Sequence, residues 1–250
     1  MELTFIFIIG ILIGSFLNVV ILRIPKDESI AFPASHCGSC KKPLKWFHNI
    51  PLFSWAFLRG KCAFCQEKIS IQYPIIELLS GVLFVVIFAK MGISIPTLLV
   101  AFSFLTLLAL SVIDLHYKMV PDSLNLLALT LAIAAAYSLT AFVDNLVNAL
   151  IFAGAFTLLR FYISFAINRE AMGEADIMVA ATMGALLGVK LTLVAIFISA
   201  LLALPAMLLT QDKEDPDSLE LPYIPFLALA TLLVYIFDTP IYAYLEATYG

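Results

Sequence analysis

Apolar residues form long runs along this chain, and short polar or turn-forming segments separate them. Most runs come close to the roughly 20 residues that an α-helix needs to cross the hydrocarbon core of a bilayer. The runs cover residues 3–23, 75–91, 96–113, 123–142, 145–166, 177–189, 191–210 and 222–238. The pattern predicts an all-α polytopic membrane protein with about eight transmembrane helices. The sixth is short and turns tightly into the seventh at Lys190.

Composition favours the same class of protein. Hydrophobic residues make up 62% of the 250 residues and charged residues only 13%, unlike the composition of a soluble domain. We therefore expect the lipid bilayer to surround most of the chain. The lysines and arginines form no basic stripe of the kind that nucleic acid requires, so we expect no nucleic acid partner. The pattern gives no oligomeric state.

Basic residues predict the orientation in the membrane. Eight of the 14 Lys and Arg lie between the first two apolar runs: Arg23, Lys26, Lys41, Lys42, Lys45, Arg59, Lys61 and Lys68. Because positively charged loops stay in the cytoplasm, this segment is predicted to be cytoplasmic and the N-terminus external. If eight spans follow an external N-terminus, the loop at Arg169 and the acidic loop 211–220 are also predicted to be cytoplasmic.

The basic segment contains all the cysteines of the chain, as two Cys-x2-Cys pairs. They are Cys37, Cys40, Cys62 and Cys65. Four thiolates at this spacing favour a tetrahedral zinc site, which is structural because it leaves no open position for a reacting water. Two disulfides or a redox-active pair are the alternatives, but stable disulfides are rare in the cytoplasm. We expect a small cytoplasmic zinc-binding lobe.

Two aspartates occupy the boundaries of apolar runs. Asp114 follows the third run and Asp176 precedes the sixth, which places both at the predicted cytoplasmic face. Carboxylates at membrane depth are costly, and those that occur are usually functional. A structural cap is a rival interpretation for Asp176 because it precedes a helix, whereas Asp114 ends a helix and gains nothing from the dipole.

A converging pair of carboxylates has a defined chemistry. Like charges held close together do not both ionise easily, so one group keeps a proton while the other acts as a base. The base takes a proton from water, and the protonated member polarises a scissile carbonyl. Such a pair is able to hydrolyse a peptide bond without an acyl-enzyme.

Several segments of the chain together resemble a known family. They are GSFLNVVILRIP from Gly14 to Pro25, the paired cysteines, IQYPIIELL from Ile71 to Leu79, Asp114 through Val120-Pro121-Asp122, and Gly173-Glu174-Ala175-Asp176. In this respect the chain is similar to the prepilin peptidases, or type IV leader peptidases, which are membrane aspartic proteases. The resemblance implies that Asp114 and Asp176 are the catalytic pair. The family motif is Gly-x-Gly-Asp, so Ala175 replaces its second glycine.

The resemblance also implies a function and a location. Such an enzyme lies in the bacterial inner membrane and cleaves the leader of type IV prepilins or pseudopilins at the cytoplasmic face. Bifunctional members, which carry a cysteine-bearing cytoplasmic segment, also methylate the new N-terminus with S-adenosylmethionine. Glu77 lies near membrane depth, and we interpret it either as a carboxylate favoured by a helix dipole or as a group that binds the substrate's cationic segment or terminal amine.

These interpretations divide the chain into a first transmembrane helix at 1–24, a cytoplasmic lobe with four cysteines at 25–73 and a transmembrane aspartic peptidase domain at 74–250. Two other classes of function fit parts of the pattern. One is a membrane thiol oxidoreductase that uses the cysteine pairs, and the other is a non-enzymatic assembly or transport protein whose acids bind protons or an ion.

Overall fold

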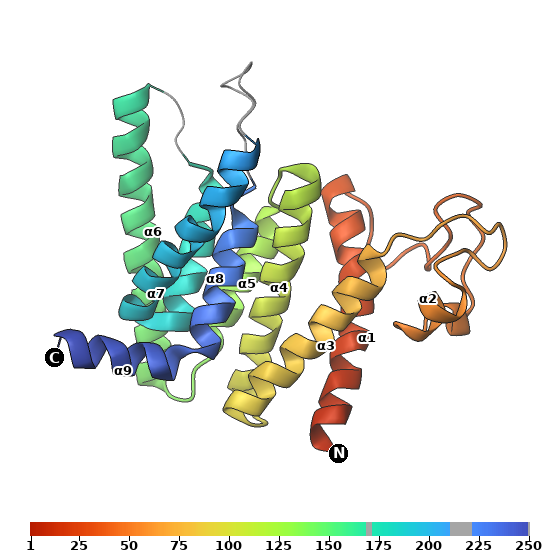
Figure 1. Cartoon of the computed structure of the whole chain (residues 1–250), viewed down its shortest axis with the longest axis horizontal. Coiled ribbons are helices and arrows are strands. Elements are labelled where there is room, and N and C mark those ends of the chain that lie inside the picture. The colour runs from red at the N-terminus through yellow and green to blue at the C-terminus, as the bar shows by residue number, and fades with distance from the viewer. Residues whose placement is uncertain (169–171, 211–221, 250) are drawn as a thin grey trace. The chain divides into compact units, whose positions relative to one another are not determined.

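The computed structural model describes residues 1–168, 172–210 and 222–249 and divides into two compact units, Met1–Gly92 and Ile93–Gly250 (Figure 1). Within the described residues the regular structure is helical, apart from isolated β-bridges at His36–Pro43 and Lys61–Lys68. The prediction of an all-α protein is confirmed. The predicted inner loops at Arg169 and 211–220 lie outside the described residues.

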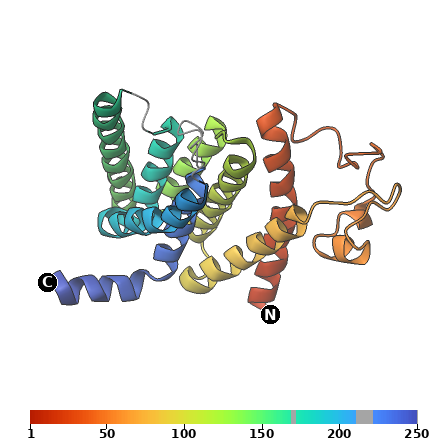
Figure 2. The same ribbon diagram turned by 45° about the horizontal axis from the view of Figure 1, so that its top comes forward.

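The first unit consists of two long helices and the lobe that connects them. Helices α1 (Glu2–Arg23) and α3 (Gln72–Met91) cross each other, and the lobe includes the short elements η1 (Ile24–Lys26), η2 (Trp46–His48) and α2 (Phe53–Phe57) (Figure 1). Figure 2 shows the same crossing from a second direction.

Glycines set the close approach of α1 and α3. A Cβ atom on Gly10 would lie 2.8 Å from the Cα of Gly81, and one on Gly14 would lie 2.8 Å from the Cα of Glu77. These separations are too short for any side chain. Small residues allow helix backbones to pack closely in a membrane, where no hydrophobic effect drives helices together. The crossing therefore depends on Gly10 and Gly14.

The second unit is a helical bundle. Its helices are α4 (Ile95–Tyr117), α5 (Asp122–Ala134), α6 (Leu139–Ile167), α7 (Glu174–Thr210), α8 (Ile224–Ile236) and α9 (Asp238–Tyr249). Helix α4 is mostly buried, whereas α6 is mostly exposed and apolar, as expected for a helix that faces lipid. Helix α9 bends away from α8 by 78° (Figure 2).

Helix α7 bends sharply at Gly188, where the backbone has φ 70° and ψ 176°. The Oγ1 of Thr192 donates a hydrogen bond to the carbonyl oxygen of Met183 at 3.1 Å. Nine residues of straight helix would separate these positions by about 13.5 Å. The tight turn that we predicted at Lys190 therefore corresponds to this bend, two residues earlier, at a glycine that tolerates a positive φ.

The predicted number of eight spans is not confirmed. Five described helices are long and apolar enough to cross a membrane, or six if the bent pair α8 and α9 forms one span, which makes the chain a multi-pass membrane protein. The apolar run 123–142 does not form one helix, because α5 ends at Ala134 and α6 begins at Leu139. At 13 residues α5 is about 20 Å long, short of the roughly 30 Å of a bilayer core.

A glycine substitution tests the crossing of α1 and α3. We expect Gly14→Ala to destabilise the protein by about 1–3 kcal/mol, because the added methyl group forces the two backbones apart. The matched control is Gly154→Ala on α6, where a Cβ atom meets nothing within 4 Å. Thermal unfolding in detergent should show a lower midpoint for Gly14→Ala and an unchanged or higher midpoint for Gly154→Ala. Equal midpoints would contradict the role of the crossing.

Candidate active site and metal centre

Asp114 lies in the last turn of α4 and is buried, with 7% of its surface exposed. Its Oδ2 accepts a hydrogen bond from the backbone N–H of Ile224, the first residue of α8, at 3.2 Å. The first N–H groups of a helix lack partners inside the helix and carry partial positive charge. Helix α8 thus supplies the favourable environment that the C-terminal end of α4 does not give to a carboxylate.

Asp176 lies in the first turn of α7 and is partly buried. Its carboxylate accepts a hydrogen bond from the backbone N–H of Gly173, one turn earlier, which is the contact that a capping residue makes at the third position of a helix. The cap that we considered as a rival interpretation is therefore present. Ala175 has no positive φ, so its backbone does not require the glycine of the family motif.

Neighbouring helices hold the segment that carries Asp176. The Nδ2 of Asn125 on α5 donates to the carbonyl oxygen of Ala175 at 3.0 Å. The Nη1 of Arg160 on α6 pairs with Oε1 of Glu174 at 3.0 Å. Sequence reasoning missed both partners. The sequence offered a signal for each of them. Asn125 is a polar residue inside the apolar run 123–142, and Arg160 is a charged residue inside the run 145–166.

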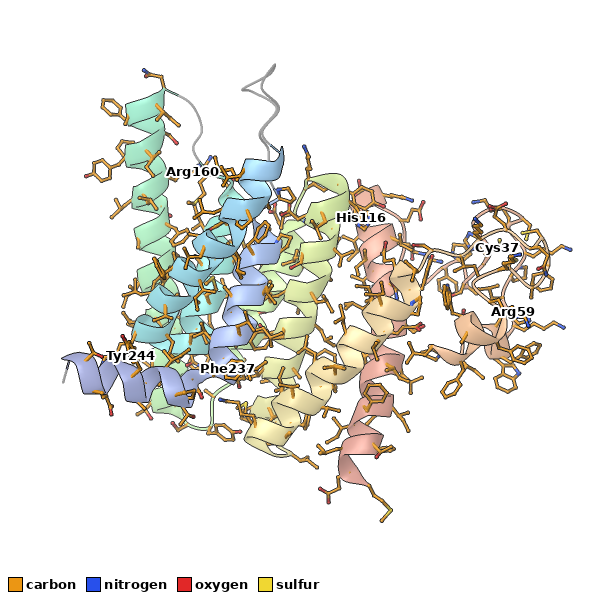
Figure 3. The ribbon with its side chains drawn as sticks, viewed as in Figure 1. Cys37, Arg59, His116, Arg160, Phe237 and Tyr244 are labelled. Atoms are coloured by element: carbon orange, nitrogen blue, oxygen red, sulfur yellow. The ribbon has the colours of Figure 1, made fainter. Side chains whose placement is uncertain are left out.

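The two aspartates lie at the same end of the second unit. Figure 3 shows His116 and Arg160 at one end of this bundle and Phe237 and Tyr244 at the other. Asp114 is two residues from His116 along α4, and Arg160 pairs with Glu174 next to Asp176. The carboxylates are close enough to interact electrostatically. A pair of this kind has the requirements for acid–base chemistry on a shared water.

The four cysteines converge in the lobe of the first unit. Cys37, Cys40, Cys62 and Cys65 are free thiols, and their sulfur atoms all lie within 4.8 Å of one another. The Sγ atoms of Cys37 and Cys65 are 3.8 Å apart. A tetrahedron with metal–sulfur bonds of about 2.3 Å has edges of about 3.8 Å, so the donor set fits a bound metal ion such as zinc.

Two equivalent turns build this metal centre. In one turn the N–H of Cys37 donates to the carbonyl of Lys42, and in the other the N–H of Cys62 donates to that of Glu67. Lys41 and Gln66, the residues that follow the second cysteine of each pair, have positive φ values of 57° and 60°. Each Cys-x2-Cys pair thereby forms a tight turn that points both sulfur atoms to the same side.

Backbone hydrogen bonds favour the metal-binding form of one thiol. The N–H groups of Cys40 and Ser39 donate to the Cys37 sulfur and lower the pKa of this thiol to about 6. A thiolate is the form that binds metal. Figure 3 shows Cys37 and Arg59 in the lobe, to one side of α1 and α3.

Glu77 lies on α3 in the first unit and is buried, with 6% of its surface exposed. Its Oε2 accepts a hydrogen bond from the backbone N–H of Leu52 at 2.7 Å. Leu52 has a φ of 61° and precedes α2, so the carboxylate fixes a strained turn of the lobe onto α3. Glu77 therefore has a structural contact, which sequence reasoning had not identified.

Comparison with known proteins identifies the family. Residues 8–91 match the bacterial peptidase A24 N-terminal domain, and residues 99–208, which include both aspartates, match the type IV leader peptidase family. The chain is 34% identical to a prepilin leader peptidase/N-methyltransferase of Bacillus subtilis over 99% of this chain and 100% of that protein. This chain belongs to the type IV leader peptidase family. The predicted resemblance is confirmed.

Other members of the family are also similar. A prepilin leader peptidase/N-methyltransferase of Neisseria gonorrhoeae is 37% identical over 80% of this chain and 79% of that protein. One from Myxococcus xanthus is 38% identical over 73% of this chain, a match that spans 55% of the Myxococcus protein. No solved structure matches the chain. The two family matches fall in the two compact units, Met1–Gly92 and Ile93–Gly250.

Removal of one cysteine tests the metal centre. We expect the purified protein to hold one metal ion per chain, and Cys62→Ser to reduce the bound metal to near zero because a structural site needs all four ligands. The control is Ser39→Ala, which lies in the Cys37–Cys40 turn, is not a ligand and keeps its backbone N–H. Elemental analysis by mass spectrometry measures both variants. Equal metal content in Cys62→Ser and the parent would contradict the assignment.

Proposed function

We propose that the chain is a membrane aspartic endopeptidase that cleaves the leader peptide of type IV prepilins or pseudopilins and then N-methylates the new N-terminus. The single observation that supports the peptidase reaction best is the position of Asp114 and Asp176. They lie at one end of the second unit, within electrostatic reach of each other, in the region that matches the family.

In this proposal Asp114 and Asp176 share one proton. The ionised carboxylate removes a proton from water as the water oxygen attacks the scissile carbonyl carbon, while the protonated carboxyl donates to the carbonyl oxygen. When the carbon–nitrogen bond breaks, the carboxyl that took the water proton passes it to the leaving amine. A hydroxyl of the tetrahedral intermediate gives its proton to the other carboxylate, so the pair returns to its first state. The reaction needs no covalent intermediate and no metal ion.

The proposed enzyme lies in the bacterial inner membrane with its N-terminus outside and its active site at the cytoplasmic face. The concentration of lysine and arginine between the first two apolar runs supports this orientation. Residues 1–24 form the first transmembrane helix, 25–73 the cytoplasmic lobe and 74–250 the peptidase domain. A prepilin with an apolar helix would partition into the bilayer, which aligns its leader with the dyad.

Two cofactors belong to the proposal. Zinc occupies the centre formed by Cys37, Cys40, Cys62 and Cys65, where it holds the lobe together. S-adenosylmethionine supplies the methyl group for the new amine, and this fits the N-methyltransferase activity in the names of the relatives.

Conservative substitutions test the peptidase mechanism. We expect Asp114→Asn and Asp176→Asn each to lower kcat for a prepilin peptide by at least about 100-fold, because an amide neither takes up nor releases the shared proton. Asp144→Asn, an exposed carboxylate on α6, is the control and should cleave normally. The measurement is cleavage by purified protein in detergent or lipid. Parental cleavage in both site variants would make the mechanism wrong.

A role for Glu77 in substrate binding is a separate proposal, in which its carboxylate receives the cationic leader or the terminal amine. Glu77→Gln removes the charge but keeps an oxygen that accepts from the N–H of Leu52. We expect a KM about tenfold higher for cleavage or methylation, equal to about 1.4 kcal/mol of binding. Glu67→Gln, an exposed residue of the lobe, is the control. Normal cleavage together with normal methylation in Glu77→Gln would remove the idea.

A further inference from the structure

A buried amide connects α5 to the segment that carries Asp176. Asn125 lies one turn into α5 and has no exposed surface. Its Nδ2 donates to the carbonyl oxygen of Ala175 at 3.0 Å, and Ala175 directly precedes Asp176. This hydrogen bond joins residues that are 50 positions apart in the chain. It therefore fixes the start of α7 against a different helix of the same unit.

Stability does not explain an asparagine at this position. The Oδ1 of Asn125 is buried and has no hydrogen-bond partner in the parts of the chain that the structure describes. A buried polar atom without a partner destabilises the folded state. The net contribution of the one hydrogen bond to Ala175 is on average smaller than that cost. Leucine has the same number of side-chain heavy atoms as asparagine and carries no polar atom to satisfy.

Asn125 contacts this segment differently from its other neighbours. Arg160 holds the exposed side chain of Glu174 from α6, and the N–H of Gly173 bonds to the carboxylate of Asp176. Both contacts act on side chains of the first turn of α7. The bond from Asn125 acts instead on the backbone at Ala175, next to Asp176.

We propose that Asn125 is a positioning residue for the peptidase reaction, which holds the backbone at Ala175 so that the Asp176 carboxylate faces Asp114. This inference rests on the proposed peptidase function. Two carboxyl groups share a proton only within hydrogen-bond reach, and a displacement of about 1 Å in a catalytic group lowers a rate by about 100-fold. Asn125 acts through the position of Asp176, so its loss lowers kcat and leaves KM unchanged.

Two variants remove the contact in different ways. Asn125→Leu keeps a branched side chain of four heavy atoms and removes both polar atoms. Asn125→Asp keeps the shape but replaces the donor with an oxygen that faces the carbonyl of Ala175. The control is Ser103→Ala, because the Oγ of Ser103 on α4 also donates to a carbonyl of α5, that of Ala128, at 2.9 Å. Ser103 is buried to the same degree but holds no catalytic segment.

The experiment measures kcat and KM for a prepilin peptide, together with the thermal midpoint, for the parent and the three variants. We expect kcat to fall by about 10- to 100-fold in both Asn125 variants with KM unchanged. We expect parental kcat in Ser103→Ala. A thermal midpoint of Asn125→Leu near that of the parent separates positioning from a loss of folded protein.

Three results would overturn the inference: parental kcat in a folded Asn125 variant, an effect confined to KM, or loss of folding in both Asn125 variants. The last result would make Asn125 a core residue and nothing more. A parent that does not cleave the peptide would instead reject the proposed function itself. The two failures are therefore distinguishable.

Discussion

The burial of the Asp114 carboxylate beside the first turn of α8 is the constraint on which the second unit depends. A charge at the C-terminal end of α4 meets the negative end of that helix, so it needs a donor from elsewhere. The N–H of Ile224 supplies this donor, and it does so only if α8 begins where α4 ends. The packing of α8 against α4 and α7 therefore sets the environment of the Asp114 carboxylate, one of the two proposed catalytic groups.

The two units use different means to stay folded in and beside a membrane. In the first unit, Gly10 and Gly14 allow the backbones of α1 and α3 to approach closely. In the polar lobe of the same unit, the sulfur atoms of four cysteines converge. In the second unit, buried side chains donate to backbone carbonyls of neighbouring helices, as the Oγ of Ser103 on α4 does to Ala128 on α5. Such bonds satisfy polar groups that have no access to water at this depth.

Local patterns in the sequence predicted much of this arrangement. Apolar runs predicted the helical class, and the spacing of the cysteines predicted their convergence, because both depend on residues close together in the chain. The run 123–142 was wrongly taken as one span, since apolar content does not show that the helix ends at Ala134. A tight turn was predicted at Lys190, where two apolar runs meet, whereas the bend of α7 lies two residues earlier, at Gly188.

The surroundings of the site were not predictable in the same way. Asp114 and Asp176 were selected from their positions and from the resemblance, and their role as a dyad stays a prediction. The donors at Ile224 and Asn125 come from helices remote in sequence, and Arg160 comes from the helix before α7. Only the packing of the bundle brings them to the site. A single sequence carries no direct signal for contacts across 110 or 50 residues.

The pH dependence of kcat/KM for prepilin cleavage tests the sharing of one proton most directly. Only the singly protonated pair is active in this account, so the profile should be bell-shaped, with the rate falling on both sides of one optimum. The parent protein must remain folded across the range, which circular dichroism verifies. A rate that is flat, or that falls on one side only, would contradict a proton shared between Asp114 and Asp176.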